Sequence, residues 1–231
     1  MPARIAVPEV KLVRSLLPAL PAEAAEEAAS SARIMTYSPG ETIMSNRQGW
    51  APAIVADGTV RMTIRSHDGR AAVLRLITRG SMIGLIGVFA GDPAAPTAER
   101  LLVAETAATV VVLDAAVVIR LALLHSKFGI DLVQSLAHIA SELTDAAGRY
   151  AFLTVRERVA AHLLRVAGSG GRAGAVTVAM TQQQLADAVG SVREVVARTL
   201  SELRSEGIIN PGRASIQIVD KRRLAEIASV T

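Results

Sequence analysis

The sequence predicts an α+β protein with an N-terminal β-roll, a long central helix and a C-terminal winged helix-turn-helix. Three observations predict this class. Short apolar runs separated by turn dipeptides fill residues 34–112, apolar residues recur at heptad spacing over 127–150, and two helix-start signals flank a glycine within 181–206. From these patterns we expect three regions: residues 1–125 for an N-terminal helix and the β-roll, 126–152 for a dimerisation helix, and 153–231 for the winged helix-turn-helix.

Composition narrows the class of protein. Of 231 residues, 51% are hydrophobic, which is typical of a globular chain rather than a disordered one. The chain has no cysteine, which excludes disulfides, thiolate zinc sites and cysteine-ligated iron–sulfur clusters. Residues 1–150 hold 14 Lys and Arg against 14 Asp and Glu, whereas 151–231 hold 11 against 7. The net charge of +4 therefore lies in the C-terminal third, which suits a polyanionic partner.

Neither a secretion signal nor a membrane span is expected. Prolines and charges interrupt residues 1–21, unlike a signal peptide. The longest apolar stretch, 107–124, contains Asp114 and Arg120, and charges near a bilayer centre cost several kcal/mol. We therefore expect a cytoplasmic protein with no membrane partner.

The first region begins with a helix and continues as strands. Pro21 suits a first helical turn and is followed by alanine and glutamate, which predicts a helix over 22–30. Alternating side chains over 59–65 and again over 71–77, across a turn at 66–70, predict a β-hairpin. Four turn dipeptides divide the strand region: Pro39-Gly40, Asp57-Gly58, Asp68-Gly69 and Arg79-Gly80. Short strands at this spacing are typical of a β-sandwich or β-roll.

The central helix carries a heptad seam over 127–150. Its members recur at alternating steps of four and three residues: Leu132, Leu136, Ile139, Leu143, Ala146 and Tyr150. Val133, Ala140 and Ala147 widen the stripe on one side, so it could contact both a partner helix and the chain's own β-region. The alternatives are self-pairing in a homodimer and an ordinary amphipathic core helix. Self-pairing is favoured because a helix that bridges two regions has few other surfaces for so long a stripe.

The final region reads as a winged helix. A helix over 155–167 ends at the glycine-rich segment 168–174. A short strand is expected at 176–178. Two helices are expected after it. They are followed by a candidate wing hairpin, made of a strand at Ile208-Ile209, a turn at Pro211-Gly212 and a strand over 215–219.

Residues 181–207 carry the helix-turn-helix signals. Thr181 with Gln184, and Ser191 with Glu194, each pair an oxygen-bearing cap with a partner three residues later. Gly190 between them permits a left-handed turn. Ala186 allows the two helices to approach closely and Val196 fills the gap between them. Three position-specific requirements are thus met together.

The second helix of this motif has an apolar face and a polar face. The inward arc is expected to comprise Val192, Val196, Thr199, Leu200 and Leu203. The outward arc comprises Arg193, Glu194, Ala197, Arg198, Ser201 and Arg204. Arginine reads guanine bidentately and a carboxylate accepts from cytosine N4, so Arg193, Glu194 and Arg198 form a candidate base-reading set.

Further DNA contacts are expected at the helix starts, where Thr181, Gln182 and Ser191 could support phosphates. Two local alternatives remain for the base-reading set. Glu194 could serve only as the capping partner of Ser191, and Arg198 could pair with Glu194 or with Glu202 on a solvated face.

The sequence resembles the cyclic-AMP receptor protein/fumarate–nitrate reductase regulator (CRP/FNR) superfamily over nearly the whole chain after the first dozen residues. Residues 181–209 resemble the helix-turn-helix of that family, and 151–164 resemble the segment that leaves its dimerisation helix. The strands and turns of its β-roll are matched by YSPGETI at 37–43, AIVADGTVRM at 53–62, DGRAAVLRLI at 68–77 and RGSMIG at 79–84. The resemblance implies a cyclic-nucleotide-binding-like jelly roll and a homodimeric transcription regulator. It also places Arg193, Glu194 and Arg198 in the base-reading positions of the cyclic-AMP branch.

The resemblance fails where that branch binds its nucleotide. Leu85 stands where the family's ribose-binding glutamate is expected, and Ala98-Glu99 stand where its phosphate-binding Arg-Ser or Arg-Thr pair is expected. A carboxylate there would repel a phosphodiester. The loop 91–100 is about three residues longer than the family's usual loop, and Arg100 is an alternative, displaced phosphate ligand. These departures argue against cyclic AMP as the effector.

Two other kinds of effector remain as alternatives to cyclic AMP. An apolar or uncharged effector could occupy a pocket of Met82, Leu85, Ile86, Leu143 and Thr144, and the absence of any ligand is equally compatible. Haem is a weaker alternative. It would use one of the four histidines, His67, His125, His138 and His162, none of which stands at a distinctive ligand spacing.

The sequence therefore predicts a transcription regulator that binds double-stranded DNA as a homodimer on an inverted repeat. The resemblance implies a TGTGA-like site and makes RNA polymerase a further candidate partner. No phosphate-binding glycine loop, metal-ligand cluster or nucleophile elbow suggests an enzyme. The alternative is a ligand-binding or protein-interaction module whose helix-turn-helix serves packing, and the outward arginines argue against it.

Overall fold

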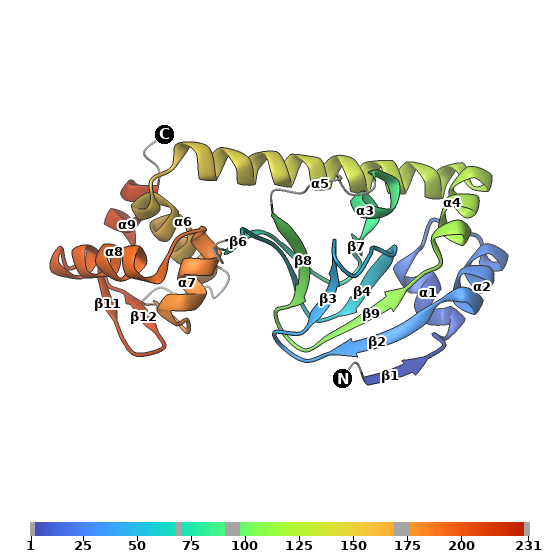
Figure 1. Cartoon of the computed structure of the whole chain (residues 1–231), viewed down its shortest axis with the longest axis horizontal. Helices are drawn as coiled ribbons and strands as arrows, with labels where there is room; N and C mark the ends of the chain where they lie inside the picture. The colour runs from blue at the N-terminus through green and yellow to red at the C-terminus, as the bar shows by residue number, and fades with distance from the viewer. Residues whose placement is uncertain (1–2, 68–70, 91–97, 169–175, 229–231) are drawn as a thin grey trace. The chain divides into compact units, whose positions relative to one another are not determined.

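A computed structural model describes residues 3–67, 71–90, 98–168 and 176–228, which form two compact units (Figure 1). Unit 1 contains the described residues of Met1–His67 and Leu74–Thr144, and unit 2 contains those of Asp68–Val73 and Asp145–Thr231. Within the described ranges, no helix is both long and apolar enough to cross a membrane. The mixed helix and strand content confirms the predicted α+β class.

Two antiparallel sheets make up the β-roll of unit 1. The first has the order β1 (Ala3–Ala6), β2 (Arg33–Tyr37), β9 (Ala108–Val112), β4 (Ala53–Asp57) and β7 (Met82–Ile83). The second has the order β3 (Thr42–Ser45), β8 (Glu99–Ala104), β5 (Val60–Arg65) and β6 (Ala71–Ile77). β5 and β6 are neighbours, so the expected hairpin is confirmed, although its turn at 68–70 lies outside the described residues.

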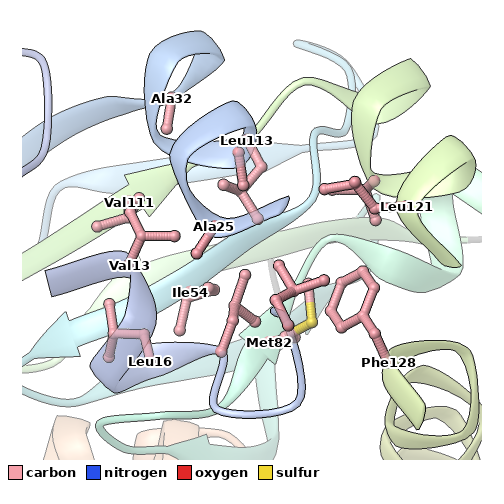
Figure 2. Packing of buried hydrophobic residues seen from close by; sticks show 14 of the residues in the cluster. Val13, Leu16, Ala25, Ala32, Ile54, Met82, Val111, Leu113, Leu121 and Phe128 are labelled. Atoms are coloured by element: carbon pink, nitrogen blue, oxygen red, sulfur yellow. The ribbon is translucent and has the colours of Figure 1, made fainter. Parts of the chain in front are cut away.

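Helices cover one face of the first sheet and enclose the larger core of unit 1. The helix expected after Pro21 is α2 (Ala22–Ser31), and α1 (Val10–Leu16) precedes it. Alanines line the buried side of α2, which lets it lie close to its neighbours. Figure 2 shows side chains of α1 and α2 meeting Ile54 and Val111 of the sheet in one apolar layer. Met82, Leu121 and Phe128 extend this layer toward the helices that follow the roll.

Three further helices follow in the chain, the first inside the roll and the other two after it. α3 (Leu85–Ala90) follows β7, and α4 (Ala115–Leu124) is capped by Asp114, whose carboxylate accepts from the Val117 N–H at 3.1 Å. α5 (Ser126–Phe152) is the long helix that the heptad pattern predicts. Its residues up to Thr144 belong to unit 1 and the remainder to unit 2.

Unit 2 is a winged helix-turn-helix. Its elements after α5 are α6 (Val155–Gly168), β10 (Val176–Val178), α7 (Gln182–Val189), α8 (Arg193–Ser205), β11 (Ile209–Pro211), β12 (Ile216–Ile218) and α9 (Lys221–Ala228). β12 pairs with both β10 and β11, which confirms the expected wing hairpin. Most of the glycine-rich segment expected at 168–174 lies outside the described residues. The helices share one apolar core with the small sheet.

Candidate nucleic-acid interface and effector cavity

The first helix of the turn motif begins with the expected capping box. The Thr181 hydroxyl accepts from the Gln184 N–H at 3.1 Å, and the Gln184 side chain accepts from the Thr181 N–H at 2.8 Å. At the other end Gly190 adopts φ 62° and ψ 48°, a left-handed conformation that glycine tolerates without strain. The Ser191 N–H then donates to the Ala186 carbonyl at 3.0 Å. The turn is therefore closed by backbone bonds that the local sequence specifies.

The second capping box expected from the sequence does not form. α8 begins at Arg193, its N-cap residue is Val192, and no side chain caps it. Ser191 lies one residue too early, because its N–H closes the preceding turn and Val192 follows it in an extended conformation. For the same reason Val192 is 39% exposed instead of joining the inward arc. Glu194 consequently has no capping role.

The rest of α8 is amphipathic as expected. Val196, Leu200 and Leu203 are buried against α6 and α7, and each such residue contributes about 1.5–3 kcal/mol through burial. Thr199 is also buried, and its hydroxyl donates to the Val195 carbonyl at 3.0 Å. This face fixes the rotation of α8 about its axis. It leaves Arg193, Glu194 and Arg198 exposed on the opposite face.

The acidic residues at the end of α8 have partners elsewhere in unit 2. Glu206 contacts Arg156 of α6 at 2.7 Å, a charge-assisted hydrogen bond that lowers the pKa of Glu206 and raises that of Arg156. Arg156 also lies 3.8 Å from Glu202, and Arg223 of α9 lies 3.8 Å from Glu206. Glu202 is thus turned toward Arg156 and not toward Arg198.

No side-chain hydrogen bond or ion pair of Arg193, Glu194 or Arg198 is found within the described part of unit 2. The local pairings that could have explained these residues are therefore not formed there. Arg213, which the sequence reasoning did not single out, is exposed in the turn between β11 and β12. The Pro-Gly turn signal could have directed attention to it, because residues at a wing tip are free to reach a partner.

One arginine ties the helices of this unit together. Arg158 of α6 donates to the Val189 carbonyl at 2.9 Å and to the Leu153 carbonyl at 2.6 Å. Its guanidinium also lies over the Tyr150 ring, 5.4 Å from the centroid. The Tyr150 hydroxyl in turn donates to the Val73 carbonyl at 3.0 Å. These contacts hold the end of α7 against α6 and the end of α5.

The residues expected to form an effector pocket are only partly brought together. Met82, Leu85 and Ile86 line a cavity of about 40 Å³ between the inner strands of the roll, α3 and α5. Leu143 and Thr144 do not line it; Thr144 is exposed and donates to the Ala140 carbonyl of its own helix at 2.9 Å.

Sequence reasoning missed several large side chains of this cavity. Trp50, Met62 and Arg75 line it, and so does Arg100, which the sequence marked only as a displaced phosphate ligand. Trp50 is the only tryptophan of the chain, which is the one signal that could have pointed to it. The cavity is therefore lined by one indole and two arginines, and no local motif predicts Trp50 or Arg75 there.

The structure shows the contacts of the residues that differ from the family's nucleotide-binding residues. Leu85 is buried with 1% exposure. Glu99 contacts Arg47 at 3.3 Å and Arg65 at 3.6 Å, so the carboxylate is held by two cations of the roll. Arg100 lies over the Trp50 ring, 5.7 Å from its centroid. The lengthened loop expected at 91–100 falls mostly on residues 91–97, outside the described residues.

The four histidines lie in separate environments, and His125 is the half-buried C-cap residue of α4. His67 is exposed, as expected for a turn, and His138 is 75% exposed and 3.8 Å from Glu142. His162 is buried in α6, where its Nδ1 lies 2.8 Å from the Arg165 guanidinium. Burial and the positive charge of Arg165 lower the pKa of His162 to about 4. None of the four is among the residues that line the cavity of about 40 Å³.

The heptad seam of α5 faces its own chain at several positions. Leu132, Ile139 and Ala146 are buried, Leu136 is half-buried against the core of unit 1, and Leu143 and Tyr150 are half-buried. Less of the predicted seam is therefore left for a partner than the spacing alone suggested. The exposed side of the helix instead presents Ile130, which is 56% exposed, and Val133, which is 65% exposed.

Comparison with known families matches both units. Residues 157–227 match the Crp-like helix-turn-helix domain, and residues 34–124 match the cyclic nucleotide-binding domain.

Individual relatives are transcription regulators. The chain is 33% identical to the transcriptional regulator SdrP of Thermus thermophilus over 181 residues, which is 75% of this chain and 82% of that protein. It is 29% identical over 185 residues, 76% of this chain and 78% of the relative, to a CRP-like cAMP-activated global transcriptional regulator of Mycobacterium tuberculosis.

Solved structures show the same fold. A transcriptional regulator of the CRP/FNR family from Eubacterium rectale aligns with a TM-score of 0.79 at 20% identity, covering 92% of this chain and 97% of its own. A CRP/FNR-family regulator from Thermus thermophilus aligns with a TM-score of 0.63 at 26% identity, covering 84% of this chain and 97% of its own.

Proposed function

The chain belongs to the CRP/FNR family of transcription regulators, and on that premise we propose that it is a homodimer that reads an inverted-repeat, TGTGA-like DNA site through α8 and is not controlled by cyclic AMP. DNA binding is implied by the helix-turn-helix domain itself. The oligomeric state, the DNA site, the reading residues and the control are the proposal.

One observation carries the DNA site: three exposed side chains of suitable chemistry stand together on the first two turns of α8. Arg193 and Arg198 each offer a planar fork of donors that matches guanine O6 and N7, and Glu194 offers an acceptor for cytosine N4. Their local partners are absent within the described part of unit 2, while Glu202 is held by Arg156. Packing alone does not require this set of outward charges, which disfavours a helix-turn-helix used only for packing.

Phosphate contacts would position α8 on the duplex. Thr181 and Gln182 stand at the start of α7, Ser191 lies in the turn, and Arg213 lies at the tip of the wing. Helix starts favour anions because their first N–H groups point outward, and an exposed arginine adds a full positive charge. These contacts carry no sequence information, so they support affinity for any duplex.

The dimer would form through the exposed stripe of α5. Within unit 1 this stripe comprises Ile130, Val133, Ala137, Ala140 and Thr144, with alternating steps of three and four residues. All five are exposed, and the spacing keeps one face of a helix along a partner helix. Small side chains at the middle of the stripe would allow close approach. The proposed partner is a second copy of this chain, since a two-fold dimer matches the inverted repeat.

Control independent of cyclic AMP is supported by the surroundings of the substituted positions. Leu85 is buried and its side chain cannot bond a ribose hydroxyl, and Glu99, which is paired with Arg47 and Arg65, supplies no positive charge for a cyclic phosphate.

The DNA proposal is tested with a duplex that carries a TGTGA-like inverted repeat and with a random duplex, each at two salt concentrations. We expect tight binding to the repeat that weakens as salt rises, because binding releases counterions. Arg193→Ala should weaken binding to the repeat by about 5–150-fold, corresponding to about 1–3 kcal/mol, with little effect on the random duplex.

Arg204→Ala is the matched control, because Arg204 is exposed in the last turn of the same helix. It removes the same charge away from the proposed reading set. Equal affinity of the unaltered protein for both duplexes, or equal losses from the two variants on the repeat, would show that Arg193 does not read a base.

The dimer is tested by light scattering of the full chain. Val133→Asp places a charge in the exposed stripe, whereas Gln134→Asp places the same charge on the neighbouring residue, about 100° around the helix. We expect the first variant to be a monomer and the second a dimer. A monomeric unaltered protein, or a dimer that tolerates both changes, would contradict the proposed interface.

A further inference from the structure

The cavity of the β-roll is too small for the ligands that such a domain would be expected to hold. Its volume is about 40 Å³, whereas small-molecule sites usually measure about 300–1,000 Å³. The cavity nevertheless has an effector-site lining, with apolar residues from both sheets and two arginines. The question is which side chain makes the cavity so small.

Trp50 contributes the largest side chain of the cavity lining. It precedes β4, packs against the apolar cluster between the two sheets, and lines the cavity. Its indole lies directly on the backbone of α3: a Cβ atom added to Gly87 would overlap three carbon atoms of the indole ring system. Only glycine at position 87 therefore lets the ring lie where it does.

Arg100 of β8 covers the same indole. Its guanidinium carbon lies 5.7 Å from the ring centroid, within the range of a cation–π contact. The indole thus contacts both the backbone of α3 at Gly87 and the guanidinium of Arg100, two groups that could otherwise contact an aromatic ligand.

The wall nearest α5 is closed by an internal ion pair. Arg75 of β6, whose side chain is 8% exposed, contacts Glu142 of α5 at 2.9 Å. Arg75, Met82 and Ile139 line both the cavity and a larger open hollow beside α5. The charge of Arg75 is thus matched within the chain, and its side chain separates the two spaces.

We propose that Trp50 is a built-in occupant of the effector cavity, which keeps the β-roll closed to cyclic nucleotides and makes DNA binding independent of them. This inference deepens the proposed function and rests on it, because it names the side chain that occupies the site where an effector would bind. An added aromatic molecule can enter only if the indole is removed, and the molecule that fits is then indole itself.

Fluorescence tests the proposal directly, since Trp50 is the only tryptophan of the chain. The full-length protein is titrated with cyclic AMP and cyclic GMP to millimolar concentration while its emission and its unfolding midpoint are recorded. We expect no change in either. A saturable change in emission with either nucleotide would overturn the proposal, because the ring would then be responding to a ligand in its own cavity.

Two variants extend the test. Trp50→Ala removes the indole and should lower the unfolding midpoint, and added indole should raise that midpoint progressively, since ligand binding to the native state stabilises it. Phe89→Ala truncates another aromatic side chain of unit 1 that is 45% exposed and does not line the cavity, so indole should leave its midpoint unchanged. Equal responses of both variants to indole would overturn the proposal.

Gly87→Ala covers the case in which Trp50→Ala fails to fold. It retains the fluorophore and should expel the ring, which shifts its emission to longer wavelength. Unshifted emission from this variant would contradict the placement of the ring. DNA binding is measured separately. Failure to recognise the inverted repeat would refute the proposed function and would leave the fluorescence result unaffected. A fluorescence response to a nucleotide would refute the occupied cavity and would leave the result on DNA recognition unaffected.

Discussion

His162 should make the stability of unit 2 depend on pH. The imidazole is buried in α6 with 9% exposure, and its Nδ1 lies 2.8 Å from the Arg165 guanidinium. Because a guanidinium can only donate, Nδ1 must accept, which requires a neutral ring with its proton on Nε2. Protonating the ring in the folded state would place a second positive charge beside Arg165. Burial is the larger cause of the lowered pKa, and the charge of Arg165 adds to it.

The pKa of about 4 in the folded state sets the direction and size of the effect. The unfolded ring has a pKa near 6.5, so between these values the unfolded chain binds a proton that the folded chain does not. The free energy of unfolding of unit 2 therefore falls as pH is lowered through this window. From about pH 7 to about pH 5 the loss is about 2 kcal/mol.

Hydrogen exchange measured by mass spectrometry can follow unit 2 within the full chain. Peptides from α6 and α8 report its opening free energy at both pH values after correction for intrinsic exchange. His162→Gln keeps an acceptor without the titration, so it should remove most of the pH dependence. His67→Gln alters an exposed histidine and should not. The reasoning would be refuted if the unaltered protein and His162→Gln lost equal free energy on acidification.

Two further substitutions test packing. Glu142→Gln leaves the buried Arg75 guanidinium without its carboxylate and should lower the free energy of unfolding of unit 1 by about 1–3 kcal/mol, read by tryptophan emission during denaturation; an unchanged transition would show that the pair contributes nothing. Gly190→Ala should cost at least about 1–2 kcal/mol, because φ is 62° and the added Cβ would lie 2.5 Å from Tyr150 Cε1. Gly148→Ala, with nothing within 4 Å, should be neutral or stabilising in the same exchange measurement, and matching losses from both glycine variants would contradict this account.

Local sequence signals predicted most elements of unit 2. The capping box of Thr181, the left-handed Gly190 and the Pro-Gly turn of the wing each depend on a few adjacent residues. They can therefore be predicted without a tertiary structure. The same is true of the strands of the β-roll and of α5. Boundaries were less secure: Ser191 has a suitable hydroxyl, but the turn needs its N–H, and α8 starts two residues later.

Several short elements were not predicted. α1, α3, α9 and β1 have four to eight residues, too few to show a clear period. They exist because neighbouring elements offer them an apolar surface. Leu224 of α9, for example, is fully buried in the core of unit 2.

What the sequence determined by itself is the outward placement of the proposed base-reading set: the capping box of α7, the Gly190 turn and the helix periodicity place Arg193, Glu194 and Arg198 outward, since the core requires the opposite face. Which side of α5 remains free was decided only by tertiary packing, because heptad spacing marks an apolar stripe without saying which surface covers it. The lining of the cavity in the β-roll was decided in the same way. Trp50, Gly87 and Arg100 are far apart in the sequence, and only the tertiary fold brings the ring, the backbone and the guanidinium together.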